Sequence, residues 1–357
     1  FEAPPDESAR REALAALRLG LPASLEGLRR RYLEYIVAAY RWLDLRGLMQ
    51  VRNLIRLPLA QVYTPLTAEK EEVRLQPTPE RDGVPVPLLP EEGARPGGPD
   101  REGYPRFERV TRRVSLDQAL REHRRMVVLG DPGSGKSTFL RYVALACAEG
   151  PEAARERLGL DDPPLPILVP LAAYVLELKK RPQETGLPPL PRPALEEFIP
   201  RYFQGLGLPD LGPLFAHVLK EGRAILLLDG LDEVTSAEER RMVAQAVEAL
   251  AATYPRCRFV VTSRIAGYDA APLGGDFARL TIAPFEREDI QRFARQWSLA
   301  FEAAGAEPET LPPEIRQRAE ARADDLFAAV TGHPAIERLA VNPLLLTILA
   351  LIHHQGT

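Results

Sequence analysis

A glycine-rich stretch in the second quarter of the chain has the residue types and spacing of a phosphate-binding loop. The stretch reads Gly130-Asp131-Pro132-Gly133-Ser134-Gly135-Lys136-Ser137, followed by Thr138, and it matches the full pattern G-x-x-x-x-G-K-[ST]. Its glycines allow a tight wrap, so that successive backbone N–H groups point at one phosphate. Lys136 supplies a cation for the β- and γ-phosphates, and the Ser137 hydroxyl can ligate Mg²⁺. These nine residues are the candidate nucleotide-binding residues.

A second acidic motif supplies the carboxylate that such a loop needs for its metal. An apolar run over residues 224–228 ends at Asp229, and Gly230, Leu231, Asp232 and Glu233 follow. A carboxylate at the end of a buried strand faces the crevice where open α/β sheets bind ligands, and there Asp229 can hold Mg²⁺ through water. Either Asp232 or Glu233 can orient or deprotonate the attacking water. The sequence leaves that choice open.

A third candidate is Arg264, which comes just after the apolar run over residues 259–261. An arginine at the end of the strand next to Asp229 can contact the γ-phosphate. The alternative is a structural ion pair, which spacing alone favours.

The surrounding pattern shows which elements would position these residues. Short apolar runs alternate with amphipathic helices, as in an open parallel α/β sheet; the runs cover residues 126–129, 165–169, 224–228, 259–261 and 280–283. Ser115 with Gln118 and Ser236 with Glu239 have the spacing of capping boxes at helix starts. From Phe285 onward the pattern is helical. The fold class expected is a P-loop NTPase core followed by a helical domain.

The domain boundaries follow from changes in composition. Residues 1–66 are expected to form a small helical segment, with a first helix capped by Ser8. Residues 67–103 are expected to be a linker, because residues 77–99 contain seven prolines and four glycines and proline blocks regular structure. The nucleotide-binding domain is then 104–284 and the helical domain 285–357, and we expect the natural chain to continue beyond it.

Composition narrows the class of protein further. The chain has 357 residues, 45% of them hydrophobic, and a net charge of −4, so it has no global basic field of the kind that binds nucleic acid without specificity. Cys147 and Cys257 match neither a disulfide framework nor a zinc site. The sequence contains neither a secretion signal nor a membrane span. A cytoplasmic protein is expected.

In several motifs the sequence resembles a NACHT-type STAND NTPase, the switch module of NOD-like receptors and of bacterial signalling and defence proteins. The resemblance covers residues 104–357. A small residue, Gly230, follows Asp229 where the AAA+ and RecA-like groups have a glutamate. Residues 262–268 resemble the sensor-1 segment, and residues 280–297 resemble the lead into the helical domain. Residues 342–347 resemble the segment whose proline, here Pro343, packs on adenine in the ADP state. In one departure, Leu171-Ala172 stands where the family often has Leu-Arg.

The resemblance implies a signalling cycle. ADP holds the module closed, ATP exchange opens it and drives self-association, and slow hydrolysis with Mg²⁺ resets it. Effector and sensor domains would lie outside this sequence, and a role in antiphage defence or innate immunity would follow. Three alternatives stay open: a work-producing ATPase of AAA+ type, against which Gly230 argues, a small-molecule kinase, and a scaffold that binds nucleotide without hydrolysis.

Overall fold

The computed structural model describes residues 24–43, 57–75, 107–179, 194–234, 236–274, 276–303 and 311–356. Within these ranges, strands form one sheet in the order β2-β1-β7-β3-β6-β5-β4. The strands are β1 (Thr67–Leu75), β2 (Phe107–Ser115), β3 (Arg125–Leu129), β4 (Leu165–Pro170), β5 (Ala224–Asp229), β6 (Arg258–Ser263) and β7 (Ala278–Ile282). Strands β3 to β7 pair in parallel. All five apolar runs are strands, which confirms the expected α/β class.

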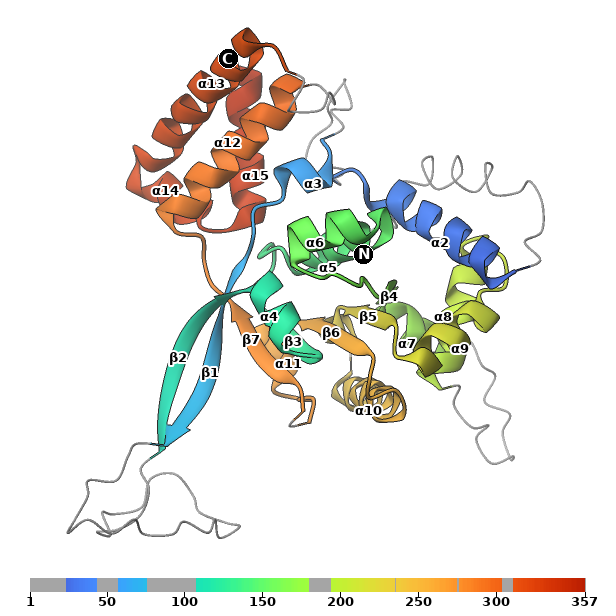
Figure 1. Cartoon of the computed structure of the whole chain (residues 1–357). Coiled ribbons are helices and arrows are strands. Elements are labelled where there is room, and N and C mark those ends of the chain that lie inside the picture. The colour runs from blue at the N-terminus through green and yellow to red at the C-terminus, as the bar shows by residue number, and fades with distance from the viewer. Residues whose placement is uncertain are drawn as a thin grey trace, which may run out of the picture.

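Strand β1 corrects the first part of the expected linker over residues 67–103, because residues 67–75 form a strand. Residues 76–103 of that linker lie outside the described residues. Residues 67–75 pair with β2 in antiparallel register from Thr67 opposite Ser115 to Leu75 opposite Phe107. Strand β1 also pairs with β7, but only over Ala68 to Lys70, so the outer part of the β1–β2 hairpin extends beyond the sheet (Figure 1). The sequence did not indicate these strands because they carry many charged residues and lack the apolar runs of buried strands.

Helices cover the sheet and form a separate bundle at one end (Figure 1). Around the sheet lie α2 (Leu25–Tyr40), α3 (Leu59–Val62), α4 (Leu116–Glu122), α5 (Lys136–Glu149), α6 (Pro151–Leu158), α7 (Leu171–Lys179), α8 (Leu195–Gly205), α9 (Gly212–Glu221), the 3₁₀ turn η1 (Leu231–Glu233), α10 (Ala237–Thr253) and α11 (Ile265–Tyr268). The bundle consists of α12 (Arg287–Ala303), α13 (Pro313–Thr331), α14 (Pro334–Ala340) and α15 (Pro343–Gly356). Among the described helices, none combines the length and apolar character needed to cross a bilayer.

Local signals explain where several helices begin. Ser115 and Ser236 accept hydrogen bonds from the backbone N–H groups of Gln118 and Glu239, as N-cap residues do. Ser24 caps α2 in the same way. The expected first helix, capped by Ser8, lies outside the described residues.

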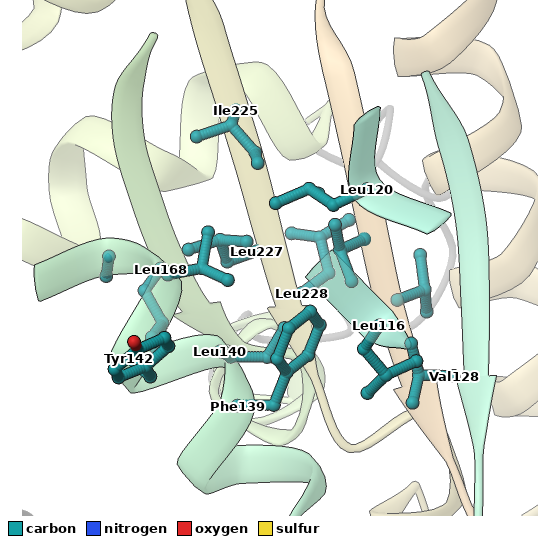
Figure 2. Packing of buried hydrophobic residues seen from close by; sticks show 14 of the residues in the cluster. Leu116, Leu120, Val128, Phe139, Leu140, Tyr142, Leu168, Ile225, Leu227 and Leu228 are labelled. Carbon is teal, nitrogen blue, oxygen red and sulfur yellow. The ribbon is translucent and has the colours of Figure 1, made fainter. Parts of the chain in front are cut away.

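The central strands and the helices beside them share one apolar core. Figure 2 shows part of it, with side chains of Leu116, Leu120, Val128, Phe139, Leu140, Leu227 and Leu228. The N-terminal helix α2 belongs to this core, because the buried Tyr32 donates a 2.7 Å hydrogen bond to the carbonyl of Pro166 in β4. Tyr32 also makes edge-on ring contacts with Phe203 and Phe215 at 5.2 Å. The core therefore fixes the strand ends at which the candidate site lies.

Candidate nucleotide-binding site

The glycine-rich loop, residues 130–137, joins β3 to α5 at the carboxyl end of the sheet. Gly133 and Gly135 have φ of +76° and +95°, a region that glycine adopts without steric cost. The N–H of Gly130 donates to the carbonyl of Ser263 at 3.3 Å, which ties the start of the loop to the end of β6. Helix α5 begins at Lys136, so its unpaired N–H groups and the positive end of its dipole lie at the loop. Such an arrangement at a helix N-terminus is suited to bind an anion.

The loop also lies where the strand order reverses. Strand β3 has β6 on one side and β7 on the other, and the chain passes through β4 and β5 before it returns to pair with β3. Open α/β sheets bind ligands in the crevice at such a switch point. The geometry is that of a P-loop NTPase-like fold.

The ammonium of Lys136 lies within the loop. Its Nζ donates to the carbonyl oxygens of Gly130 at 2.7 Å and Asp131 at 2.9 Å. A phosphate oxygen would replace one or both of these carbonyls as the acceptor. Beside Lys136, the hydroxyl of Ser134 is buried with no hydrogen-bond partner among the described residues, while Ser137 and Thr138 in the first turn of α5 are half-buried.

Charged groups at the ends of β5 and β6 act on the ammonium of Lys136. Burial lowers the pKa of its ammonium, and the charge of Asp232 opposes that shift. The charges of Arg264, which lowers this pKa, and of Asp229, which raises it, also act on the amine. Strands β3, β6 and β5 are neighbours in the sheet, so the loop after β3 lies beside the carboxyl ends of β6 and β5.

Asp229 is held by a neighbouring hydroxyl. Thr262 of β6, which is fully buried, donates to Asp229 Oδ1 at 2.6 Å. The same hydroxyl accepts the N–H of Gly230 at 2.9 Å. Thr262 thus holds the carboxylate of Asp229 through a neutral partner.

Asp232 has a charged partner instead. Its Oδ2 lies 2.9 Å from Nε of Arg264, and its Oδ1 accepts the Arg264 backbone N–H, also at 2.9 Å. The Asp232 side chain is 9% exposed and the Arg264 side chain 55%. The ion pair left open by the sequence is therefore present, and it presents the guanidinium toward solvent; contact of Arg264 with a phosphate stays a prediction.

Glu233 occupies a different place from Asp232. It is exposed, and its carboxyl group lies over Gly230, where an added Cβ would meet Glu233 Cδ at 2.7 Å. Gly230 also has a φ of +76°. The positive φ favours glycine at this position, because a side chain here would be strained.

The helical bundle contacts the loop directly through Asn342. Its Nδ2 donates to the carbonyl of Pro132 at 3.0 Å, and its Oδ1 accepts the N–H of Leu344 at 3.1 Å. The Leu344 N–H also lies 3.2 Å from the carbonyl of Gly133. Pro343 begins α15 between these two residues, so the structure brings it beside the loop, while its contact with a base stays a prediction.

A second contact to the glycine-rich loop that the sequence did not indicate comes from the segment before β1. Leu66 is buried, and its Cδ1 would lie 3.1 Å from a Cβ on Gly135. In the same segment Thr64 donates to Gln296 Oε1 of α12 at 3.0 Å, and Tyr63 stacks on Tyr142 of α5 with ring centroids 3.9 Å apart. A single leucine carries no signal in the sequence, so only the structure could place it at the loop.

The donor set fits Mg²⁺ and a nucleotide. A serine hydroxyl and a carboxylate are the hard oxygen ligands that Mg²⁺ prefers, and Mg²⁺ takes its remaining ligands from phosphates and water. Among the described residues no cluster of three or more His, Cys, Asp or Glu side chains could hold a metal ion.

Comparison with known proteins adds little to this geometry. No family model matches the sequence, and no curated protein matches it. One solved structure that matches is a point variant of RuvB from Thermotoga maritima, with 12% sequence identity and a TM-score of 0.25. The match covers 68% of this chain and 66% of the RuvB chain. A likeness at this level says nothing about activity, so the functional argument depends on the site itself.

Proposed function

We propose that the chain binds ATP and ADP with Mg²⁺ and hydrolyses ATP slowly, as a signalling switch of NACHT/STAND type. The observation that carries the proposal is the order of the strands. The glycine-rich loop with Lys136 follows β3, Asp229 ends β5, and Thr262 of β6, the strand between them, holds Asp229. A loop that gathers N–H donors and an ammonium beside a charged carboxylate suits a polyphosphate with its cation.

Each residue then has a distinct task. The loop amides and Lys136 bind and orient the phosphates, and Ser137 and Asp229 would hold Mg²⁺. When bound, Mg²⁺ neutralises the charge that develops on the phosphate oxygens during transfer. Arg264 reaches out from its pair with Asp232 to read the γ-phosphate.

The water-orienting role goes to Glu233. Both oxygens of Asp232 are engaged by Arg264, which leaves that carboxylate as a support for the arginine. Glu233 is exposed beside Gly230 and can accept a proton from water. Because no glutamate directly follows Asp229, we expect slow turnover.

The base would lie against apolar side chains at the edge of the loop. Pro343 and Leu344 of α15 meet the loop from the bundle, and Leu66 meets it from the segment before β1. These side chains are apolar, and that of Leu344 is exposed, which suits contact with a base. A base held between the bundle and the sheet would make nucleotide retention depend on how the bundle is docked.

The same contact supports the switch. Because Asn342 and Leu344 bond to loop carbonyls, a nucleotide that changes the loop changes the docking of the bundle, provided that ATP and ADP differ in affinity for the two states. We propose that ADP retains the closed state and that ATP exchange promotes self-association and activation of an effector outside this sequence, with bacterial defence as the setting.

The test begins with what the protein carries. Purified protein is denatured and the released nucleotide identified by chromatography; stoichiometric ADP is expected.

A second experiment tests the site. Lys136→Ala should abolish stabilisation by added nucleotide, which at about 100 times Kd amounts to roughly 2.7 kcal/mol in the natural sequence. Lys220→Ala, an exposed lysine on α9, is the matched control. An unchanged nucleotide effect in Lys136→Ala would refute the site, and rapid continuous turnover with an empty site would refute the switch.

A further inference from the structure

Arg240, a residue on α10 to which the proposed function gives no role, joins two segments of the candidate site. Its Nη1 donates to the carbonyl of Gly267 in α11 at 2.9 Å, and its Nη2 donates to the carbonyl of Val234 after η1 at 3.0 Å. One planar guanidinium thus holds the segment after β5 and the segment after β6 at a fixed separation.

These two segments carry the partners of the ion pair described above. Asp232 lies in η1, two residues before Val234, and Arg264 lies three residues before Gly267. The segments also touch directly, since a Cβ on Gly267 would lie 2.8 Å from Asp232 Cβ. Gly267 of α11 thus lies so close to Asp232 that it leaves no room for a side chain. Arg240 holds the two segments together at this contact.

The bonding of Arg240 is specific rather than incidental. Its Nε is buried without a hydrogen-bond partner among the described residues. Among the described residues, the carbonyls of Gly267 and Val234 are therefore the hydrogen-bond partners that hold this guanidinium. The neighbouring Arg241 differs, because it is exposed and has a single 3.3 Å bond to the carbonyl of Ala270.

We propose that Arg240 is a positioning residue that fixes the Asp232–Arg264 pair and thereby sets the rate of hydrolysis, but not the affinity for nucleotide. The inference rests on the proposed ATPase function. Binding should be spared because the loop, Lys136 and Asp229 are held by contacts that do not include Arg240. The rate should suffer because a small displacement of a charge-stabilising group lowers turnover steeply.

The experiment compares Arg240→Met with Arg241→Met, using hydrolysis and nucleotide affinity as separate readouts. Arg240→Met should lower kcat roughly 10- to 100-fold with an unchanged Kd, Arg240→Lys should recover part of the rate, and Arg241→Met should match the natural sequence. If the natural sequence neither binds nor hydrolyses ATP, the proposed function fails; if it hydrolyses ATP and the two Met variants have equal kcat, the inference about Arg240 fails.

A second variant keeps the test valid if Arg240→Met does not fold. Gly267→Ala places a methyl group against Asp232 from the other side of the same contact, and it should lower kcat at constant Kd in the same way. A double-mutant cycle with Asp232→Asn then separates positioning from general stability. Arg240→Met should reduce the rate much less in the Asp232→Asn background, and strictly additive rate effects would overturn the proposal.

Discussion

The candidate site has two halves that are built differently. In the inner half, the glycine-rich loop and Asp229 are held by strand ends and by the neutral hydroxyl of Thr262. In the outer half, Asp232 and Arg264 lie beyond the strand ends and are held by their own opposite charges. The hydrogen-bond partner of Asp229 is neutral, whereas Asp232 is paired with the guanidinium of Arg264. Two carboxylates three positions apart are thereby given separate roles.

Replacing each carboxylate by its amide should give the largest effects on ATP hydrolysis, and the two effects should differ. Asp229→Asn removes the charge that would hold Mg²⁺, so ATP hydrolysis should fall by about 100-fold or more, the scale of losing a charge-stabilising group. Asp232→Asn removes the partner of Arg264, so its defect should be smaller and should not depend on the Mg²⁺ concentration. Phosphate release measured across a Mg²⁺ titration distinguishes the two variants.

The control is nucleotide binding in the presence of a chelator, which both variants should retain because the loop and Lys136 are intact. If high Mg²⁺ restored Asp232→Asn and left Asp229→Asn unaffected, the assignment of the two carboxylates would be reversed.

Thr262 allows a finer test of the inner half. Thr262→Val keeps the shape of the side chain but leaves the N–H of Gly230 and Oδ1 of Asp229 without this partner. The free energy of unfolding should fall by about 1–3 kcal/mol, the usual cost of unpaired buried polar groups. Urea denaturation measures this loss. Thr262→Ser, which restores the hydroxyl, should recover most of the stability, and equal losses in both variants would mean that packing of the methyl group matters more than the hydrogen bonds.

The fold was predictable where apolar side chains alone determine structure. Each of the five parallel strands appears in the sequence as a short apolar run. Strands β3 to β6 are buried almost throughout, whereas β7 carries the exposed Arg279. Strand β1 was assigned to a linker because its charged side chains, such as Glu69 and Lys70, give no such run. Its formation depends on backbone pairing with β2 and β7, and pairing between distant segments leaves no local pattern.

The site was predictable to a similar extent. The loop and Asp229 follow from spacing, because their tasks require particular residue types at fixed separations. The partners of these residues were not predictable: Arg240 and Leu66 are single residues whose contacts depend on tertiary packing. Asn342 lies in the segment that the sequence analysis named because of Pro343. Its hydrogen bond to the loop joins residues 210 positions apart, and the sequence did not indicate it.

The smallest expected effect concerns Asn342. It tests whether the glycine-rich loop is held by the sheet alone or also by the helical bundle. The side chain of Asn342 has two functions, since Oδ1 accepts N–H groups at the start of α15 and Nδ2 donates to Pro132. Asn342→Ala removes both, so unfolding by urea should show a loss of about 1 kcal/mol, typical of a lost N-cap. Asn342→Asp keeps the acceptor and cannot donate, so it should recover the share that the cap contributes. The remaining difference from the natural sequence measures the bond to the loop. If Asn342→Asp were as unstable as Asn342→Ala, the bond to Pro132 would be the main contribution, and the loop would depend on the bundle as much as on the sheet.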